Sequence, residues 1–424
     1  MRNSPLHRTL ASLAAIFFIF PAVCAASDGD AVKVTILSNF TSDVARGKVL
    51  NALIEQFNQA HRGRIEVVSN PDPDWPTLQQ KIKSMIAAGS PPDVFLYNFN
   101  PSDLTREQSG QLMDWSAYLN ADSGWQANFD PKNLEAVTVN KQIVAIPSDQ
   151  APVLIYYHKD LFQKAGIQSF PTTWDEFFKD AEKLKAIGVP AIALMTADDA
   201  WHTMNAFTYL ATAAGGVDVF NLNQSLNSPA IVEGATQLKK LFNYTTPDAV
   251  GANYAISSNN FITGKAAMVI DGPWLISSLQ SAGANDVGVA VAPTNGDDRV
   301  PAGYIVTDSL NLWGAGKATN KAKEEAVTEW IKFLTSVDNA RKMAVEGQYP
   351  VAVKIELTQE DINRAGPLMG AVLQYNLAAP AKVVEAVRNI KPAATAQLPS
   401  LLEALAIGQV SPPDFANQLQ GFNK

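Results

Sequence analysis

Residues 32–68, VKVTILSNFTSDVARGKVLNALIEQFNQAHRGRIEVV, decide the fold. The segment opens with a β-branched, alternating run from Val32 to Leu37, which is typical of a buried strand. A single apolar stripe at helical spacing follows, made of Val49, Leu50, Leu53, Ile54 and Phe57. Gly63 ends this helix, and Ile65 to Val68 forms a second strand. A strand, a helix and a strand in this order predict two parallel strands joined by a helix.

The same alternation continues along the chain. A second helix over 78–86 stops at Gly89 and Pro91, and a third strand covers Val94 to Tyr97. In the middle of the chain, Thr173 and Glu176 form a capping box before an amphipathic helix. Further strands are predicted at 153–157, 191–195, 266–270 and 287–291, and a strong helix at 321–334. The sequence therefore predicts an α/β protein with mainly parallel sheets and helices on both faces.

Composition excludes several classes of protein. The chain has 424 residues, 47% hydrophobic and 17% charged, and a formal net charge of −8. Low charge with ample apolar content argues against intrinsic disorder, and the acidic balance argues against a basic nucleic-acid binder. Mean hydropathy of −0.03 is too low for a polytopic membrane protein. One Cys excludes a disulfide scaffold and any Cys-rich metal site.

The N-terminus has the three parts of a secretory signal peptide. Basic residues precede the apolar stretch Leu10 to Phe20, and Pro21 and small residues follow it. This stretch is shorter than the roughly 20 residues that span a bilayer. We predict a signal peptide over 1–25, cleaved after Ala25 or Ala26, and a soluble periplasmic protein. Lipid attachment at Cys24 is the less favoured alternative, because Pro21, Ala22 and Val23 match a lipoprotein signal poorly.

Two α/β units without a long linker between them must be joined by short crossings. The polar segment 293–301 and the segment 347–350 are candidate crossings. Ligands of open α/β sheets bind at the carboxyl ends of the strands, so we expect a binding cleft between the two units.

Several short runs in this order resemble the family 1 extracellular solute-binding proteins. These are the carbohydrate-type receptors of ABC importers, a group that includes maltose-binding protein. The central run comprises Ile146-Pro147, then LIYYHKDLF at 154–162, KAGI at 164–167 and PTTWDE at 171–176. Further matches are GSPPDV at 89–94, FITGKAAM at 261–268, DGPW at 271–274, WIKFLTS at 330–336 and Tyr349-Pro350. One such run would be weak evidence, whereas the ordered set from about residue 32 to 350 is specific.

The resemblance implies a two-lobe periplasmic binding protein fold of type II that closes on its ligand about a hinge. It implies three crossings, which we expect near Asp149, near 292–302 and near 347–353. The N-terminal lobe would comprise 26–149 plus 297–348, and the C-terminal lobe 150–296 plus 349–424. The implied function is that of a receptor that binds a sugar or oligosaccharide and delivers it to the permease subunits of an ABC importer. We expect a monomer, without cofactor, metal or nucleic acid.

Sugars are bound by aromatic faces that stack on their C–H groups and by planar polar side chains that bind their hydroxyls. Trp274 stands at the tryptophan of the family's Gly-Pro-Trp motif, a stacking residue in sugar-binding relatives. Tyr97 matches the aromatic position after the Pro-Asp-Val-type motif. The other candidate ligand contacts lie at strand ends, in loops or at the expected crossings: Asn39, Phe40, Asn98, Asp149, Gln150, Trp201, His202 and Tyr304.

Two other functions stay open. A receptor for a non-sugar solute, such as a glycerophosphate or a polyol, would need an Arg or a helix N-terminus for a phosphate group. A secreted glycosidase would need two carboxylates about 5–10 Å apart, which spacing cannot exclude. The four His do not pair at metal-ligand spacing, and no catalytic signature such as G-x-S-x-G occurs. We therefore predict no catalytic residues and favour the receptor.

Overall fold

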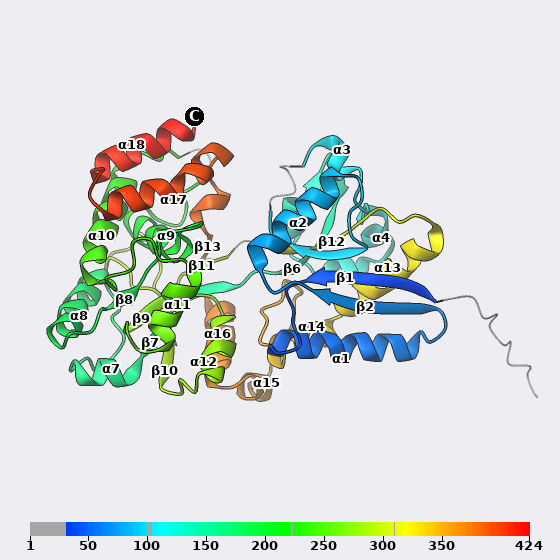
Figure 1. The fold of residues 1–424 in the computed structure, drawn as a ribbon, viewed down its shortest axis with the longest axis horizontal. Helices are drawn as coiled ribbons and strands as arrows, with labels where there is room; N and C mark the ends of the chain where they lie inside the picture. The colour runs from blue at the N-terminus through cyan, green and yellow to red at the C-terminus, as the bar shows by residue number, and fades with distance from the viewer. Residues whose placement is uncertain (1–30, 100–103, 222–223, 309) are drawn as a thin grey trace, which may run out of the picture.

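A computed structural model describes residues 31–99, 104–221, 224–308 and 310–424. The predicted signal peptide, with Cys24 and its cleavage site, lies outside these residues. The chain forms two lobes, each built on one large sheet, which stand side by side in Figure 1. None of the helices in the described residues combines the length and the apolar character needed to cross a membrane.

The sheet of lobe one has five strands in the order β2-β1-β3-β12-β6. Strand β1 pairs in parallel with both β2 and β3, whereas β12 is antiparallel to both β3 and β6. Four strands thus share one direction and β12 opposes them. Their bounds are β1 Val32–Ser38, β2 Ile65–Pro71, β3 Val94–Tyr97, β6 Ala145–Asp149 and β12 Asn311–Ala315.

The sheet of lobe two has the order β13-β11-β7-β9-β8, and β10 also pairs with β7. Strand β7 is antiparallel to β9, β10 and β11, while β8 follows β9 and β13 follows β11 in parallel. The mainly parallel strand directions are confirmed, with one reversed strand in each sheet. The bounds are β7 Pro152–His158, β8 Ile192–Ala193, β9 Met268–Asp271, β10 Val287–Ala290, β11 Ile305–Thr307 and β13 Lys382–Val384.

Helices cover both faces of each sheet, because side chains alternate along every strand. In β7, Val153 and Ile155 enter one core cluster and Leu154 and Tyr156 enter the other. In lobe one, one face packs on α1 Ala45–Ala60 and α13 Lys321–Leu334, and the other on α2 Trp75–Ala87. In lobe two, the first face packs on α8 Trp174–Ala186, α9 Trp201–Gly215, α10 Pro229–Leu241, α17 Pro392–Ala406 and α18 Pro412–Phe422. The second packs on α11 Tyr254–Ile262, α12 Leu275–Ser281 and α16 Pro367–Ala378.

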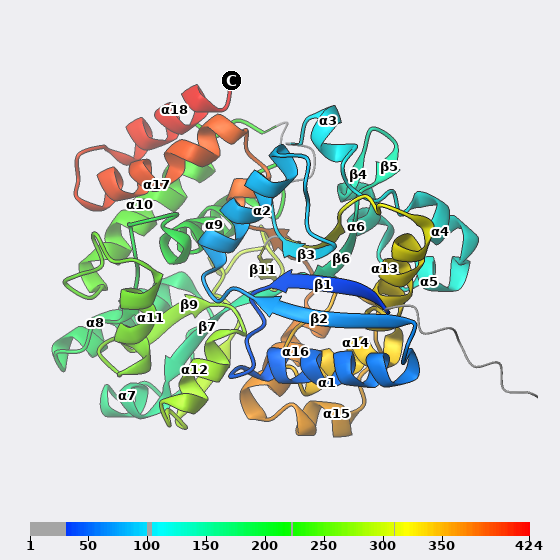
Figure 2. The same ribbon diagram turned by 45° about the vertical axis from the view of Figure 1, so that its right-hand side comes forward.

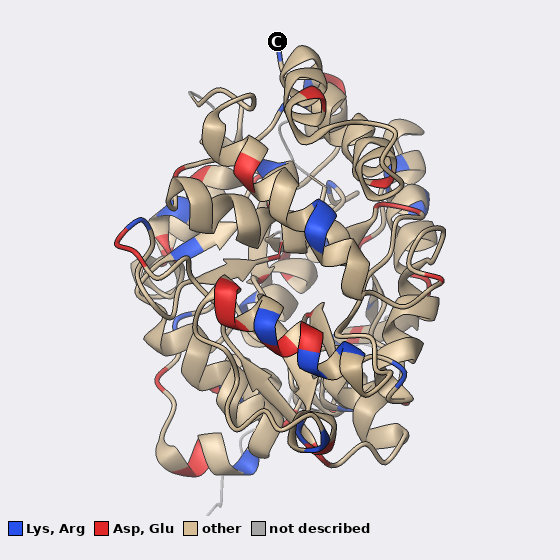
Figure 3. Ribbon diagram, turned by 90° about the vertical axis from the view of Figure 1, so that its left-hand side faces the viewer, with Lys and Arg blue, Asp and Glu red and all other residues tan. Residues whose placement is uncertain are grey.

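Helix ends follow the predicted chemistry. The Oγ1 of Thr173 accepts the backbone N–H of Glu176 at 3.2 Å, and the Glu176 carboxylate accepts the N–H of Thr173 at 3.2 Å, so the capping box of α8 is confirmed. Charges of both signs alternate along this helix on the outer face of lobe two (Figure 3).

Short elements complete the fold. They are α3 Arg106–Ser109, α4 Ser116–Ala121, α5 Ser123–Ala127, α6 Pro131–Ala136, β4 Thr138–Val139, β5 Gln142–Ile143, α7 Lys159–Lys164, α14 Val337–Val345 and α15 Gln359–Arg364. Single 3₁₀ turns cover Phe242–Tyr244 and Ala386–Arg388.

The chain crosses between the lobes at three places, two of which differ from the expected boundaries. The first crossing joins Asp149 of β6 to Pro152 of β7. The second joins β11 to β12 between Thr307 and Asn311, so the expected boundary at 297 is wrong. The third follows Val353, which packs in lobe one, and precedes Leu357, which packs in lobe two, so the boundary at 349 is wrong as well.

The polar segment 293–301 is not a crossing. The Thr294 carbonyl accepts the N–H of Trp174 at 2.9 Å, and Asn295 and Arg299 donate side-chain hydrogen bonds to the carbonyls of Ala213 and Ala214. These contacts hold the whole segment against lobe two. Its polarity reflects bonds to one lobe and not a span between two.

Candidate ligand-binding site

Two tryptophans form an aromatic wall on lobe two. Trp201 begins α9, and Trp274 stands just before α12. Their ring centroids lie 5.4 Å apart with a tilt of 53°, and both side chains are partly exposed. Both were predicted as ligand contacts, and the structure brings them together from loops at the carboxyl ends of β8 and β9. Paired indoles with open faces are suited to stack on the C–H face of a sugar.

Trp274 is held in place by the turn that precedes it. The Asp271 carboxylate accepts the N–H of Gly272 at 2.7 Å, which fixes the start of the turn. A Cβ built on Gly272 would lie 2.3 Å from the indole of Trp274. The ring therefore folds back over Gly272, and only glycine leaves room for it.

A buried polar network behind the wall positions Tyr254. His202 is fully buried, with Nδ1 2.8 Å from the Ser257 hydroxyl and Nε2 3.4 Å from the Asp271 carboxylate. The Tyr254 hydroxyl donates to the same carboxylate at 3.1 Å. Burial first and Asp271 second raise the pKa of Tyr254 well above its usual value, so the phenol stays neutral. His202 was predicted as a ligand contact; in this structure it is buried and packs against the partly exposed Tyr254.

Two carboxylates flank Trp201. Its indole N–H donates to Glu385 at 3.2 Å, and its backbone N–H donates to Asp199 at 3.2 Å. Burial and the neighbouring Glu385 raise the pKa of Asp199. Asp198 and Ala200 adopt left-handed backbone conformations with φ of 57° and 51°, which places Asp199 on a tight turn. Neither carboxylate was predicted. Asp199 is exposed and can accept hydrogen bonds from ligand hydroxyls, whereas Glu385 is buried and also accepts the Arg388 guanidinium at 3.4 Å.

Lobe one presents an arginine that sequence reasoning missed. Arg46 lies in the first turn of α1, and its guanidinium stands 5.3 Å from the centre of the Phe40 ring. Burial lowers the pKa of Arg46, and Asp149, Tyr254 and Asp43 oppose this effect. The Phe40 ring beneath Arg46 packs on Tyr349, whose hydroxyl binds Asp149 at the first crossing, so Arg46 lies beside the crossings between the lobes. The N-terminal end of α1 points toward lobe two in both ribbon views (Figures 1 and 2).

Asp149 lies where the crossings meet. It is 1% exposed, accepts the Asn311 amide at 3.0 Å and accepts the Tyr349 hydroxyl. Burial raises the pKa of Asp149 to about 8, against the opposing effects of Asn311 and Arg46. Asp149 was predicted to bind sugar hydroxyls, but both of its oxygens are already used within the protein. It ties the first, second and third crossings together on the side of lobe one.

Three aromatic residues predicted as ligand contacts are packed in a core in this structure. Phe40 is 1% exposed and packs edge-on against Trp313 and Tyr349. Tyr97 is fully buried beside Phe95, its neighbour on the same face of β3. Tyr304 is fully buried in lobe two and donates its hydroxyl to the Tyr209 carbonyl at 3.1 Å. None offers a face to a ligand.

The predicted polar contacts outside the crossings are partly buried. Asn39 follows β1, and its Oδ1 is enclosed without a hydrogen-bond partner. Asn98 follows β3 and is partly exposed; its backbone N–H donates to Gln79 at 3.1 Å, and a ligand contact by its side chain stays a prediction. Gln150 lies in the first crossing and is partly exposed. A ligand contact by Asn39 or Gln150 stays a prediction.

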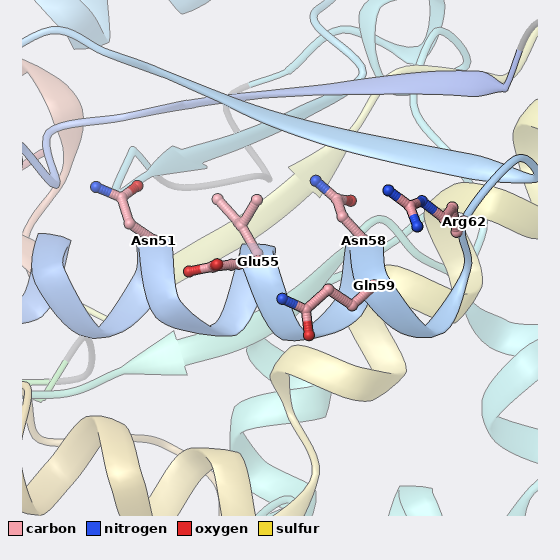
Figure 4. Close-up of a pocket in the computed structure, with 6 residues that line it drawn as sticks. Asn51, Glu55, Asn58, Gln59 and Arg62 are labelled. Carbon is pink, nitrogen blue, oxygen red and sulfur yellow. The ribbon is translucent and has the colours of Figure 1, made fainter.

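A shallow hollow on the outside of lobe one is a separate feature. It is lined by residues of α1 and the turn after it, namely Asn51, Ile54, Glu55, Asn58, Gln59 and Arg62 (Figure 4). Asn58 is occupied by two hydrogen bonds to the backbone of Val67. No aromatic side chain lines the hollow, so we assign no sugar to it. Within the described part of the chain, no three His, Cys, Asp or Glu residues gather as metal ligands.

Comparisons with known proteins agree with this architecture. The family model of the bacterial extracellular solute-binding proteins matches residues 41–341. The multiple sugar-binding protein of Streptococcus mutans is 25% identical over 350 residues, covering 78% of this chain and 77% of that one. The galactooligosaccharide-binding protein of Bacillus subtilis is 22% identical over 385 residues, covering 89% and 86%.

Solved structures share the fold. A chitin oligosaccharide binding protein superposes with a TM-score of 0.78 at 25% identity, covering 93% of this chain and 98% of that one. It is a two-lobe solute-binding protein of type II, as the resemblance implied for this chain. The relatives found by fold and by family are binding proteins and not enzymes. The family match over most of the chain and the shared two-lobe fold show that this protein belongs to the bacterial extracellular solute-binding protein family.

Proposed function

We propose that the protein binds a sugar or oligosaccharide between its lobes and delivers it to the permease subunits of an ABC importer. The paired indoles of Trp201 and Trp274 carry this proposal. They offer apolar faces for a sugar ring, while the exposed Asp199 beside Trp201 can accept its hydroxyls. The names of relatives that bind galactooligosaccharides and chitin oligosaccharides support this class of ligand.

The receptor function requires the ligand to favour a closed arrangement of the lobes. A ligand shifts such an equilibrium only through its higher affinity for one state. A sugar stacked on the wall of lobe two gains that affinity when lobe one closes over it and excludes water from its hydrogen bonds. The predicted signal peptide places this step in the periplasm, where we propose that the protein acts as a monomer.

Removal of one stacking face tests the proposal. We expect Trp274→Ala to weaken sugar binding about tenfold or more, because an aromatic contact with its buried area exceeds 1.4 kcal/mol. Titration calorimetry on the protein without residues 1–25 measures this change, after a thermal-shift screen of mono- and oligosaccharides identifies a ligand. Phe422→Ala is the matched control, since Phe422 is exposed on α18. Equal affinity in the wild type and Trp274→Ala would show that the site is elsewhere.

A glycosidase would use the same region differently. Asp199 and Glu385 are two carboxylates that interact beside Trp201, which is the arrangement that favours this second candidate. The two functions differ in the fate of the ligand, because a receptor releases its sugar intact. Incubation with the best-binding oligosaccharide, followed by an assay for new reducing ends, separates them. Release of reducing ends that Glu385→Gln abolishes would replace the receptor with an enzyme.

A further inference from the structure

The guanidinium of Arg46 has no hydrogen-bond or ion-pair partner among the residues that the structure describes. Among the described residues it makes no hydrogen bond or ion pair, and its Nε is enclosed without an acceptor. Buried or half-buried arginines normally pair with carboxylates or carbonyls, because an uncompensated charge away from water is costly. The apolar Phe40 ring beneath Arg46 supplies packing, but it cannot replace an anion.

The nearby acids do not supply that anion. Asp149 is the first charge that acts on Arg46, but its oxygens accept hydrogen bonds from Asn311 and Tyr349. Its pKa of about 8 also leaves most of the carboxyl protonated, and therefore uncharged, at neutral pH. Asp43 stands on an exposed loop in water. Among the described residues, Arg46 therefore keeps a positive charge beside the crossings that no hydrogen-bonded or ion-paired acid balances.

The opposite wall has the opposite character. Tyr254 lies on lobe two, where its hydroxyl binds the Asp271 carboxylate close to Trp274, and 36% of its surface is exposed. Asp199 adds an exposed carboxylate beside Trp201 on the same lobe, while the buried Glu385 is paired with Arg388. An anionic group would be repelled there and attracted to lobe one. The site thus has an acidic, aromatic side for hydroxyls and a cationic side for an anion.

We propose that Arg46 binds an anionic group of the ligand, a carboxylate or a phosphate ester, and that the ligand is an acidic sugar. This inference rests on the proposed sugar site and adds the charge and orientation of its ligand. The neutral ring stacks on Trp201 and Trp274, and the anionic end points to α1. The planar guanidinium can hold such a group with two parallel hydrogen bonds.

Matched pairs of neutral and acidic sugars test the charge directly. The probes are glucose with glucuronate, galactose with galacturonate, and glucose with glucose 6-phosphate, each titrated into the protein without residues 1–25. We expect an acidic member to bind about 10- to 100-fold more tightly than its neutral partner, as for a charged hydrogen-bonded pair. Uronates and the phosphate ester distinguish the two sources of the anion.

Two variants assign the preference to one residue. Arg46→Met keeps the apolar stem over Phe40 and should abolish the preference for the acidic member. Lys48→Met removes a charge from an exposed position on the same helix and should preserve it. A preference for the neutral member, or an acidic preference that survives in Arg46→Met, would overturn the inference and leave the sugar receptor in place.

Stability without ligand gives a second readout. Removal of an uncompensated charge should raise the melting temperature of Arg46→Met above that of the wild type. If none of these probes binds the wild type, the ligand is not one of these monosaccharides, the oligosaccharide screen decides the sugar proposal, and this measurement decides the role of Arg46. A raised melting temperature would support an anion site there, whereas a lowered one would show a structural arginine and overturn the inference.

Discussion

The buried carboxyl of Asp149 makes the stability of the protein depend on pH. Its pKa is raised from 3.8 to about 8 by burial, so the folded protein holds this proton over a range in which the unfolded chain has released it. The folded state therefore binds more protons than the unfolded state between these two values. It follows that the free energy of unfolding falls as the pH rises from about 4 to about 8.

The size of the effect follows from the shift. Each pH unit between the two pKa values lowers the free energy of unfolding by about 1.4 kcal/mol, or by ~4 kcal/mol between pH 4 and pH 7. Asp149 is 1% exposed, so little solvent screening reduces this figure. Asp149→Asn has the shape of the protonated acid and no charge to lose. The free energy of unfolding of Asp149→Asn, relative to that of the wild type, should therefore increase by about 1.4 kcal/mol per pH unit up to pH 8.

Chemical denaturation of both proteins across this pH range measures the difference. Far-UV circular dichroism and tryptophan fluorescence should report the same transition, which licenses a two-state free energy. Asp361→Asn is the control, because hydrogen bonds from Thr358 lower the pKa of Asp361. The contribution of the Asp361 carboxylate to stability is present above its unfolded pKa and is lost only as the pH falls through its lower folded pKa. The difference in free energy of unfolding between the wild type and Asp361→Asn therefore stays constant from about pH 5 to 8. A flat difference for Asp149→Asn as well would refute the reasoning.

Two further substitutions separate the site from the core. Gly272→Ala should displace Trp274, whose indole lies 2.3 Å from the added Cβ, and calorimetry should show a loss of sugar affinity similar to that of Trp274→Ala. Unchanged affinity would show that the ring position is unimportant. Tyr304→Phe removes the hydrogen bond to the Tyr209 carbonyl and should cost about 1 kcal/mol in denaturation, with ligand affinity preserved. A weaker ligand affinity of Tyr304→Phe would show that Tyr304 contributes to ligand binding.

Local patterns were enough to predict most elements of the fold. Helix α13 and strand β3 have the predicted bounds, because their apolar spacing and flanking breakers are contained within a few residues. The reversed strands β7 and β12 were not predicted. Both follow crossings between the lobes, and their direction is set by partners more than 100 residues away in the chain. Local periodicity contains no information on that direction.

The aromatic residues predicted as ligand contacts fall into two groups, those whose rings are covered by other residues and those whose rings stay partly exposed. Tyr97 stands two residues after Phe95 in a buried strand, so strand alternation already places both rings on one covered face. Trp201 begins α9 and Trp274 stands just before α12, both beyond the ends of buried strands, and both stay partly exposed. Position in a strand or after it was therefore the signal that could have removed Tyr97 from the predicted site. For Phe40 no such signal existed, because Tyr349 covers it from the third crossing.

Arg46 and Glu385 could not be found from local sequence. Arg46 is a candidate anion-binding residue because Asp149 already accepts hydrogen bonds from Asn311 and Tyr349. These two residues lie 162 and 200 residues from Asp149 in the chain. Glu385 meets Trp201 across 184 residues. An arginine or a helix N-terminus at the site is the feature that would indicate an anionic ligand. Arg46 is such an arginine, because Asp149 nearby is already hydrogen-bonded to other residues.

The Asp149 network also determines where the lobes can move. Asp149, Asn311 and Tyr349 stand at the lobe-one ends of the three crossings and are hydrogen-bonded to one another. The Ala352 N–H donates to the Ser148 carbonyl at 2.8 Å, which joins the first and third segments through the backbone as well. These groups therefore move with lobe one as a single unit. Any rotation of lobe two is confined to the few residues between this network and the starts of β7 and α15 and the end of β11, and it would carry Tyr254 toward or away from Arg46.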